Sequence, residues 1–124
     1  MKRILFVCCM LTATCVIPTQ KAAAQTSVSV TTFNTKVGEL DALIGAGSMT
    51  AAQVKWNEIH DMMKQELAAT KQNIASSATP ATSPYMTTMQ TQIGLYREIW
   101  ELKNDLSANR AALNTKLLAF SATF

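Results

Sequence analysis

The sequence predicts an all-α protein, an antiparallel three-helix bundle or hairpin with a long C-terminal helix, preceded by a secretory signal segment. Apolar residues recur at helical spacing in three stretches, 29–44, 50–75 and 84–121. Glycine-containing and Ser/Thr/Pro-rich segments separate these stretches, as expected for helix ends and loops. A separate apolar run, residues 4–17, precedes the three stretches. The chain from residue 25 onward therefore reads as one small helical domain.

Residues 1–24 have the features of a cleavable signal peptide. Lys2 and Arg3 open the segment, an apolar run covers residues 4–17, and small residues at 22–24 offer a cleavage site. The run is shorter than the roughly 20 residues of a membrane span. A lipid-anchored cysteine is the less favoured alternative, because Leu11 lies one position too far from Cys15. We expect cleavage near Ala24 and a secreted or periplasmic domain over residues 25–124 that does not span a membrane.

Removing the signal changes the charge and the redox chemistry of the chain. The formal net charge of +3 comes from Lys2, Arg3 and Lys21, and the remaining chain has eight basic and eight acidic residues. A neutral domain without a basic excess argues against a nucleic-acid partner. The three cysteines lie at positions 8, 9 and 15, so the exported domain has no disulfide and no thiol chemistry. Its stability must come from apolar packing.

The first two helices are predicted from apolar periodicity and from their end signals. In the first, spacings of three and four residues place on one face Val30, Phe33, Val37, Leu40 and Ile44. Gly45-Ala46-Gly47 follows as the stop. The second helix begins with a capping box between Thr50 and Gln53. Its apolar stripe contains Trp56, Ile59, Met63, Leu67 and Ile74.

The third helix is predicted to run from residue 84 to residue 121, with Ser83 as N-cap and Pro84 at its first position. One apolar register holds Met89, Ile93, Tyr96 and Trp100, and a second runs on to Phe120. A straight helix of this length would overhang the other two. Either it bends near 107–109, or its end packs on a second copy or another partner, with self-association slightly favoured. The candidate interaction surface on that overhang is Leu113, Leu117, Phe120 and Phe124.

Two short motifs show a resemblance to a known family. Met49-Thr50-Ala51-Ala52-Gln53 resembles the Leu-Thr-x-x-Gln motif of the Spy/CpxP-type periplasmic helical proteins, and Met86-Thr87-Thr88-Met89-Gln90 is a second copy. The resemblance implies a helical, cradle-like dimer that shields unfolded proteins in the periplasm without ATP. Both motifs have Met where Leu is usual. The Arg-rich surface of that family has no counterpart, because the exported chain has two arginines, Arg97 and Arg110.

Candidate chemical sites are sparse. His60 is the single histidine, and it pairs with methionines at 62, 63, 86 and 89 as a conceivable copper set, although core packing explains these residues better. Trp56 and Trp100 read as core or interface anchors. Carboxylates at helical spacing, such as Glu58 and Asp61, read as a solvated face. The sequence therefore predicts no enzyme, no cofactor and no metal.

Three functions remain open. The first is a non-enzymatic protein of the bacterial envelope that acts through helix-mediated contacts with itself or a protein partner. The second is a Spy/CpxP-like chaperone or stress sensor. The third is a minor helical subunit of a secretion or conjugation apparatus. Low charge together with many Ala, Thr and Met residues fits all three.

Overall fold

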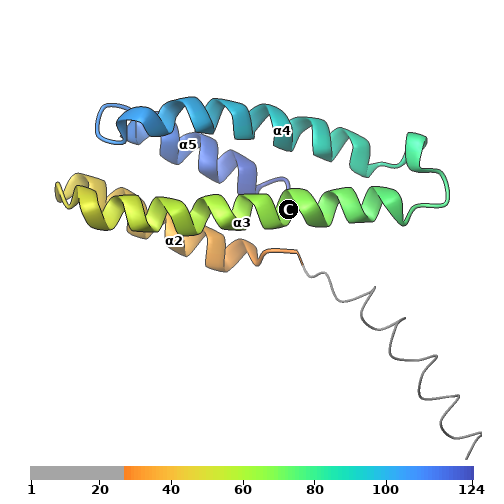
Figure 1. Cartoon of the computed structure of the whole chain (residues 1–124), viewed down its shortest axis with the longest axis horizontal. Helices are drawn as coiled ribbons and strands as arrows, with labels where there is room; N and C mark the ends of the chain where they lie inside the picture. The colour runs from red at the N-terminus through yellow and green to blue at the C-terminus, as the bar shows by residue number, and fades with distance from the viewer. Residues whose placement is uncertain (1–26) are drawn as a thin grey trace, which may run out of the picture.

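The computed structural model describes residues 27–124 and shows an all-α bundle (Figure 1). The predicted signal segment lies outside the described residues. The helices and single 3₁₀ turns are, in chain order, α2 (Val30–Gly45), α3 (Met49–Ala75), η1 (Pro80–Thr82), α4 (Tyr85–Leu102), η2 (Lys103–Asp105) and α5 (Arg110–Ser121).

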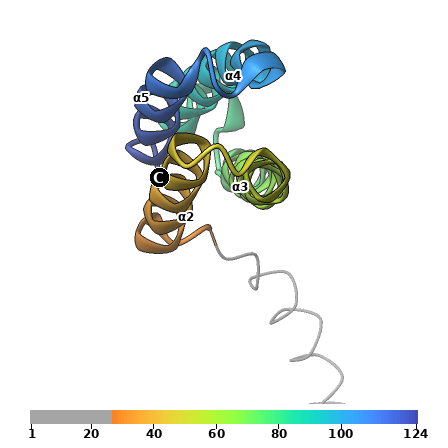
Figure 2. The same cartoon turned by 90° about the vertical axis from the view of Figure 1, so that its left-hand side faces the viewer.

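The four α-helices pack antiparallel as a bundle, each running opposite to the next along the chain. Seen end-on in Figure 2, α2 lies against α3 and α5, and α4 lies against α3 and α5. The two inner helices of the sequence, α3 and α4, are longer than α2 and α5. They extend past the short pair at the end where η1 joins them (Figure 1). The short pair therefore covers part of the length of the α3–α4 hairpin.

The core is apolar and draws on all four helices. Phe33 is fully buried, and its ring lies 6.0 Å from that of Phe120 at a tilt of 33°; Phe124 meets both rings edge-on. The largest fully buried side chains are Phe33, Phe120, Leu40, Ile59, Met63, Ile99, Leu113, Leu117, Gln92 and Val37. Each fully buried aliphatic or aromatic side chain contributes about 1.5–3 kcal/mol. The predicted buried faces of the first two helices are confirmed at Phe33, Val37, Leu40, Ile44, Trp56, Ile59 and Met63, but Val30, placed on the same face, is 44% exposed.

Glycines shape the turn between α2 and α3. Gly47 has a φ of 74°, and its N–H donates to the carbonyl of Ile44 while that of Ser48 donates to Leu43. This is a Schellman ending, which strongly favours glycine at the left-handed position. Gly45 has a different role, because a Cβ there would lie 2.7 Å from the Arg110 guanidinium. The predicted stop is confirmed, with α2 ending at Gly45.

The predicted capping box at the start of α3 does not form. The helix begins at Met49, one residue early, and its N-cap Ser48 makes no side-chain capping hydrogen bond. Gln53 instead donates to the side chain of Asn57 at 3.2 Å. The Schellman turn before Ser48 sets the entry of the chain, so Thr50 is already inside the first helical turn.

The predicted single C-terminal helix over 84–121 is wrong, because the chain turns back between Leu102 and Arg110. Asp105 accepts a hydrogen bond from the N–H of Ala108 at 2.9 Å, and the Asn109 amide donates to the carbonyl of Leu102 at 2.9 Å. Leu106 is 5% exposed and anchors the turn in the core. The result is a fourth helix, α5, which packs against α2 and α4. Of the two alternatives that the sequence left open, the bend is the one observed.

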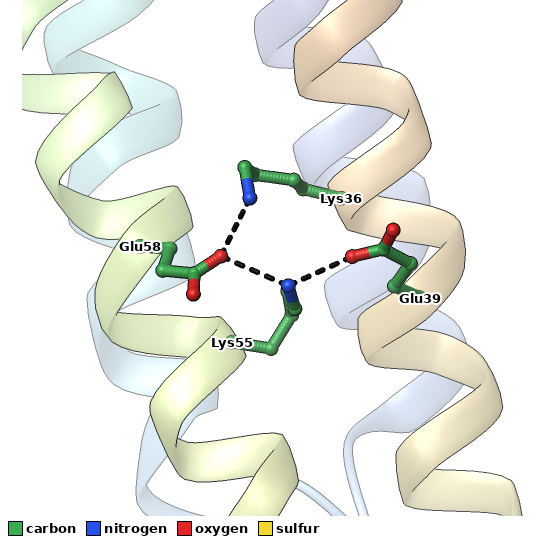
Figure 3. A network of polar contacts seen from close by, with 4 residues as sticks. All are labelled: Lys36, Glu39, Lys55 and Glu58. Carbon is green, nitrogen blue, oxygen red and sulfur yellow. Dashed lines mark hydrogen bonds and ion pairs between the residues drawn. The ribbon is translucent and has the colours of Figure 1, made fainter.

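An ion-pair network joins α2 to α3 on their outer side (Figure 3). Lys36 lies 2.6 Å from Glu58, and Lys55 bridges Glu58 at 2.9 Å and Glu39 at 2.8 Å. The hydrogen bonds from Lys36 and Lys55 lower the pKa of Glu58 from 4.5 to about 2. The side chains of Glu39 and Glu58 remain over 40% exposed, so each pair contributes little alone. A bidentate pair between Arg110 and Asp41 joins α5 to α2 in the same way.

Candidate protein-contact surface

The predicted interaction residues lie mostly inside the bundle. Leu113 is 1% exposed, and Leu117 and Phe120 are fully buried against α2 and the rest of the core. Phe124 is half-buried beside Phe33 and Phe120. The prediction that these side chains lie exposed on an overhang is wrong, because the turn after Leu102 folds them back onto their own chain.

The exposed apolar surface lies instead on α4. Met86, Ile93 and Trp100 are 36%, 39% and 45% exposed, and they recur at intervals of seven residues. We call these three residues the α4 stripe. Seven residues are nearly two helical turns, so the stripe is one row about 21 Å long on one side of the helix. Tyr85, 45% exposed, precedes Met86 in the first turn of α4 and lies about 100° around the helix from it, outside the stripe.

An aromatic cluster supports the Trp100 end of the stripe. The ring of His60 on α3 lies 5.9 Å from Trp56, 5.7 Å from Tyr96 and 5.0 Å from Trp100. Tyr96 and Trp100 are nearly parallel, at 11° with centroids 6.3 Å apart. The Tyr96 hydroxyl and His60 Nε2 are hydrogen-bonded at 2.7 Å. These contacts hold Trp100 in one orientation although its outer side is open to solvent.

Two lysines, Lys64 and Lys103, lie near this cluster, and Lys64 is paired with Asp61. The Lys103 ammonium lies 4.1 Å from the Trp100 ring centroid, a cation–π distance. Partial burial, with Lys64 and Lys103 nearby, lowers the pKa of His60 below its usual 6.5, against an opposing effect of Asp61. At neutral pH His60 is therefore an uncharged hydrogen-bonding partner of Tyr96.

Concave features of the described residues are small or shallow. A half-open pocket between α2 and α5 holds about 10 Å³, the size of one water. A shallow open hollow of about 260 Å³ lies beside the stripe, lined by Tyr96, Arg97, Trp100 and Glu101. A deep apolar pocket is the usual place for a small ligand. The open hollow fits a contact surface better than a substrate site.

The other candidate site residues contact aromatic rings, the apolar core or lysine side chains. His60 contacts aromatic rings, and Met63 is fully buried in the core. Within residues 27–124 no three His, Cys, Asp or Glu side chains gather to hold a metal ion. Glu58 is held by two lysines and Asp61 by Lys64. Over the same residues no helix is long and apolar enough to cross a bilayer.

Two residues of the α4 stripe, Ile93 and Trp100, belong to a register predicted from the sequence, but Met86 was not placed in it and the exposure of the row was not predicted. Met89, Ile93, Tyr96 and Trp100 share one register of α4, while a second register includes Leu95, Ile99 and Leu102. The second register meets the core at Ile99, which is fully buried. The apolar face of α4 is wider than packing against the core requires. A face of that width indicates that the helix contacts something besides the core.

Comparison with known proteins identifies no relative: no family model, no curated protein and no solved structure matches this chain.

Proposed function

We propose that this protein is a small non-enzymatic contact module of the bacterial cell envelope, exported by the signal segment 1–24 and acting through the outer side of its α3–α4 hairpin. The observation that supports the proposal is the α4 stripe. Met86, Ile93 and Trp100 are each more than a third exposed, while core side chains such as Ile99 are fully buried. Exposed apolar side chains gathered on one side of a small domain are typical of a contact site.

The rigidity of the surface adds support. Trp100 is held by His60, Tyr96 and Lys103, so it loses little side-chain freedom on binding. Tryptophan, tyrosine and arginine are the residues that contribute most at protein interfaces. Tyr96, Arg97 and Trp100 line one hollow. This is the composition expected of an interface centre.

Photo-cross-linking in the producing cell tests the proposal. A photoreactive amino acid at Ile93, in the middle of the stripe, is expected to give a discrete adduct with another protein. The matched control places the same group at Ala119, an exposed position on α5. Equal adducts at both positions, or none at Ile93, would contradict the proposal.

A chaperone role like that of the Spy/CpxP-type proteins is the alternative. It is favoured by the exposed Met86 and by the position of Met49-Thr50-Ala51-Ala52-Gln53 at the start of α3. A holdase suppresses aggregation of unfolded proteins at stoichiometric amounts, and the Ile93→Glu variant should lose that activity. A discrete adduct without suppression favours the contact module over the chaperone.

A further inference from the structure

His60 lies at the centre of the aromatic cluster that supports Trp100. Its ring lies 5.9 Å from that of Trp56, 5.7 Å from that of Tyr96 and 5.0 Å from that of Trp100. Its Nε2 forms a 2.7 Å hydrogen bond with the Tyr96 hydroxyl. Histidine is the side chain whose ordinary pKa lets its charge change near neutral pH. Protonation of His60 therefore puts a positive charge in direct contact with these rings.

The Trp100 ring already has one cation against it. The Lys103 ammonium lies 4.1 Å from the ring centroid, and among the described residues Lys103 forms no salt bridge. Trp100 itself is 45% exposed. A cation–π contact that is open to solvent is weak and easily broken. Lys103 therefore covers part of the exposed Trp100 ring without being fixed there.

Charged side chains from three elements face His60 or border its cluster: Asp61 and Lys64 on α3, Arg97 and Glu101 on α4, and Lys103 in η2. Asp61 and Lys64 pair with each other at 2.7 Å, and their effects on His60 have opposite signs. Arg97 and Glu101 have opposite charges and line the same hollow. The charged residues of α2 that reach α3 belong to the network of Figure 3. A new charge at His60 therefore acts mainly against Lys103.

A protonated His60 and the bound position of Lys103 disfavour each other. Partial burial, then Lys64 and Lys103, lower the pKa of His60 below its usual 6.5, against an opposing effect of Asp61. Coupling between two groups is reciprocal, so the lysine that disfavours the imidazolium is itself disfavoured by it. His60 stays in place when charged, because the Tyr96 hydroxyl can donate to a neutral Nε2 or accept from a protonated one. The contact that breaks is the one made by the flexible lysine.

Building on the contact function proposed above, we propose that His60 is a pH switch of the α4 stripe. When its imidazole takes a proton from solvent, the imidazolium displaces Lys103 from the Trp100 ring, and the uncovered ring face joins the apolar surface of the stripe. When the proton leaves, Lys103 returns and covers the ring. The contact surface is therefore more apolar in mildly acidic solution than at neutral pH, and a partner binds it more tightly there.

A proton NMR titration of the purified protein tests the switch. The ring current of Trp100 shifts the ε-methylene protons of Lys103 upfield as long as the ammonium lies over the ring. As pH falls from about 8 to about 4, we expect this upfield shift to be lost with the same midpoint as the imidazole protons of His60. A Lys103 shift that stays constant while His60 titrates would overturn the inference, and so would an imidazole that stays neutral over the whole range.

A variant without the titrating group is the control for this experiment. His60→Gln keeps a side chain that can form a hydrogen bond with Tyr96 but cannot become charged. The Lys103 shift should then be independent of pH, and its loss at the wild-type midpoint would assign the effect to another group and overturn the inference. Circular dichroism confirms that the variant is folded, and the wild-type titration decides the question without any variant.

Photo-cross-linking separates the switch from the contact function. With the photoreactive group at Ile93, Lys103→Ala should give about two- to fivefold more adduct at neutral pH than wild type, because binding no longer has to break a cation–π contact. The matched control is Lys116→Ala, which removes a lysine paired with Glu98 and should leave the yield unchanged. A discrete adduct with equal yield in Lys103→Ala and wild type would contradict the switch and leave the contact function standing. No adduct in any of these proteins, together with a Lys103 shift that follows His60, would contradict the contact function alone.

Discussion

Among the described residues, Glu66 is the most deeply buried one with an ionisable side chain, at 4% exposure. Its carboxylate accepts a hydrogen bond from the backbone N–H of Val28 at 2.8 Å. Val28 itself is 7% exposed. A buried N–H without an acceptor is costly, so Glu66 fastens the segment before α2 onto α3.

Replacing Glu66 separates this role from general packing. Glu66→Ala leaves the Val28 N–H without its acceptor and should lower the free energy of unfolding by about 1–3 kcal/mol. Glu66→Gln keeps an acceptor oxygen and should lower it less. Urea unfolding measures both. Equal losses for the two variants would contradict the assigned hydrogen bond.

His60 should titrate below its usual pKa of 6.5, because partial burial and the nearby Lys64 and Lys103 disfavour its charged form. A lowered pKa in the folded state means that the stability contributed by neutral His60 is present above pH 6.5 and is lost as pH falls through that region. NMR titration of the imidazole gives the value. Lys103→Met should raise it, whereas the distant Lys116→Met should not; a pKa above 6.5 in the wild type would contradict this account.

At the level of elements, the turn between α4 and α5 decides the fold. It contains no glycine or proline, and no residue in it has a positive φ. The side chains of Asp105 and Asn109 supply the hydrogen bonds that end one helix and lead into the next. Such residues compete with the helix for backbone groups, which is why they favour turns. Helical periodicity on both sides masked that preference.

A pair of neighbouring substitutions tests the fourth helix. Leu117 is fully buried, whereas Leu118 is 42% exposed. Leu117→Glu places an unpaired charge in the core and should abolish cooperative unfolding, whereas Leu118→Glu should change the free energy of unfolding by about 0.5 kcal/mol or less. Thermal denaturation followed by circular dichroism compares them. A Leu117→Glu protein as stable as wild type would support the straight third helix instead.

At the level of the whole molecule, the unequal helix lengths leave one end of the α3–α4 hairpin without cover (Figure 1). Some of the buried side chains near this end are polar. Gln92 is fully buried and donates to Thr123 at 3.0 Å, and Thr70 and Ser121 are buried as well. Buried positions of a core are usually apolar, so these buried polar side chains mark where the apolar four-helix core ends.

Acid should weaken the connection between α2 and α3. The folded pKa of Glu58 is about 2 against 4.5 for the free group, so its contribution is present above pH 4.5 and is lost as pH falls toward 2. The stability difference between wild type and Glu58→Gln should therefore shrink over that range. Urea midpoints between pH 6 and pH 2 measure it. A difference that stays constant with pH would contradict the network, and Glu101→Gln, which removes a carboxylate outside it, is the control.

Local pattern was sufficient for most of the secondary structure. The periodicity of residues such as Phe33, Val37 and Leu40 identified the buried face of α2, and the glycines identified its end. The same pattern located the C-terminal end of α3 at Ala75 and its buried face as far as Met63, whereas Leu67 and Ile74, placed on that face, are only partly buried. The periodicity did not predict which face of α4 is exposed, because apolar residues have the same helical spacing whether they face the core or solvent.

The sequence by itself determined an all-α domain, the position of most helix ends and the apolar registers of α4, because these depend on residues a few positions apart. The tertiary structure decided that the chain reverses after Leu102 and that Leu113 and Leu117 are core while Trp100 is exposed. That choice depends on α5 packing against α2, as in the Arg110–Asp41 pair between residues 69 positions apart. Helical spacing repeats on every face of a helix, so only the packing of distant segments selects the face that is buried.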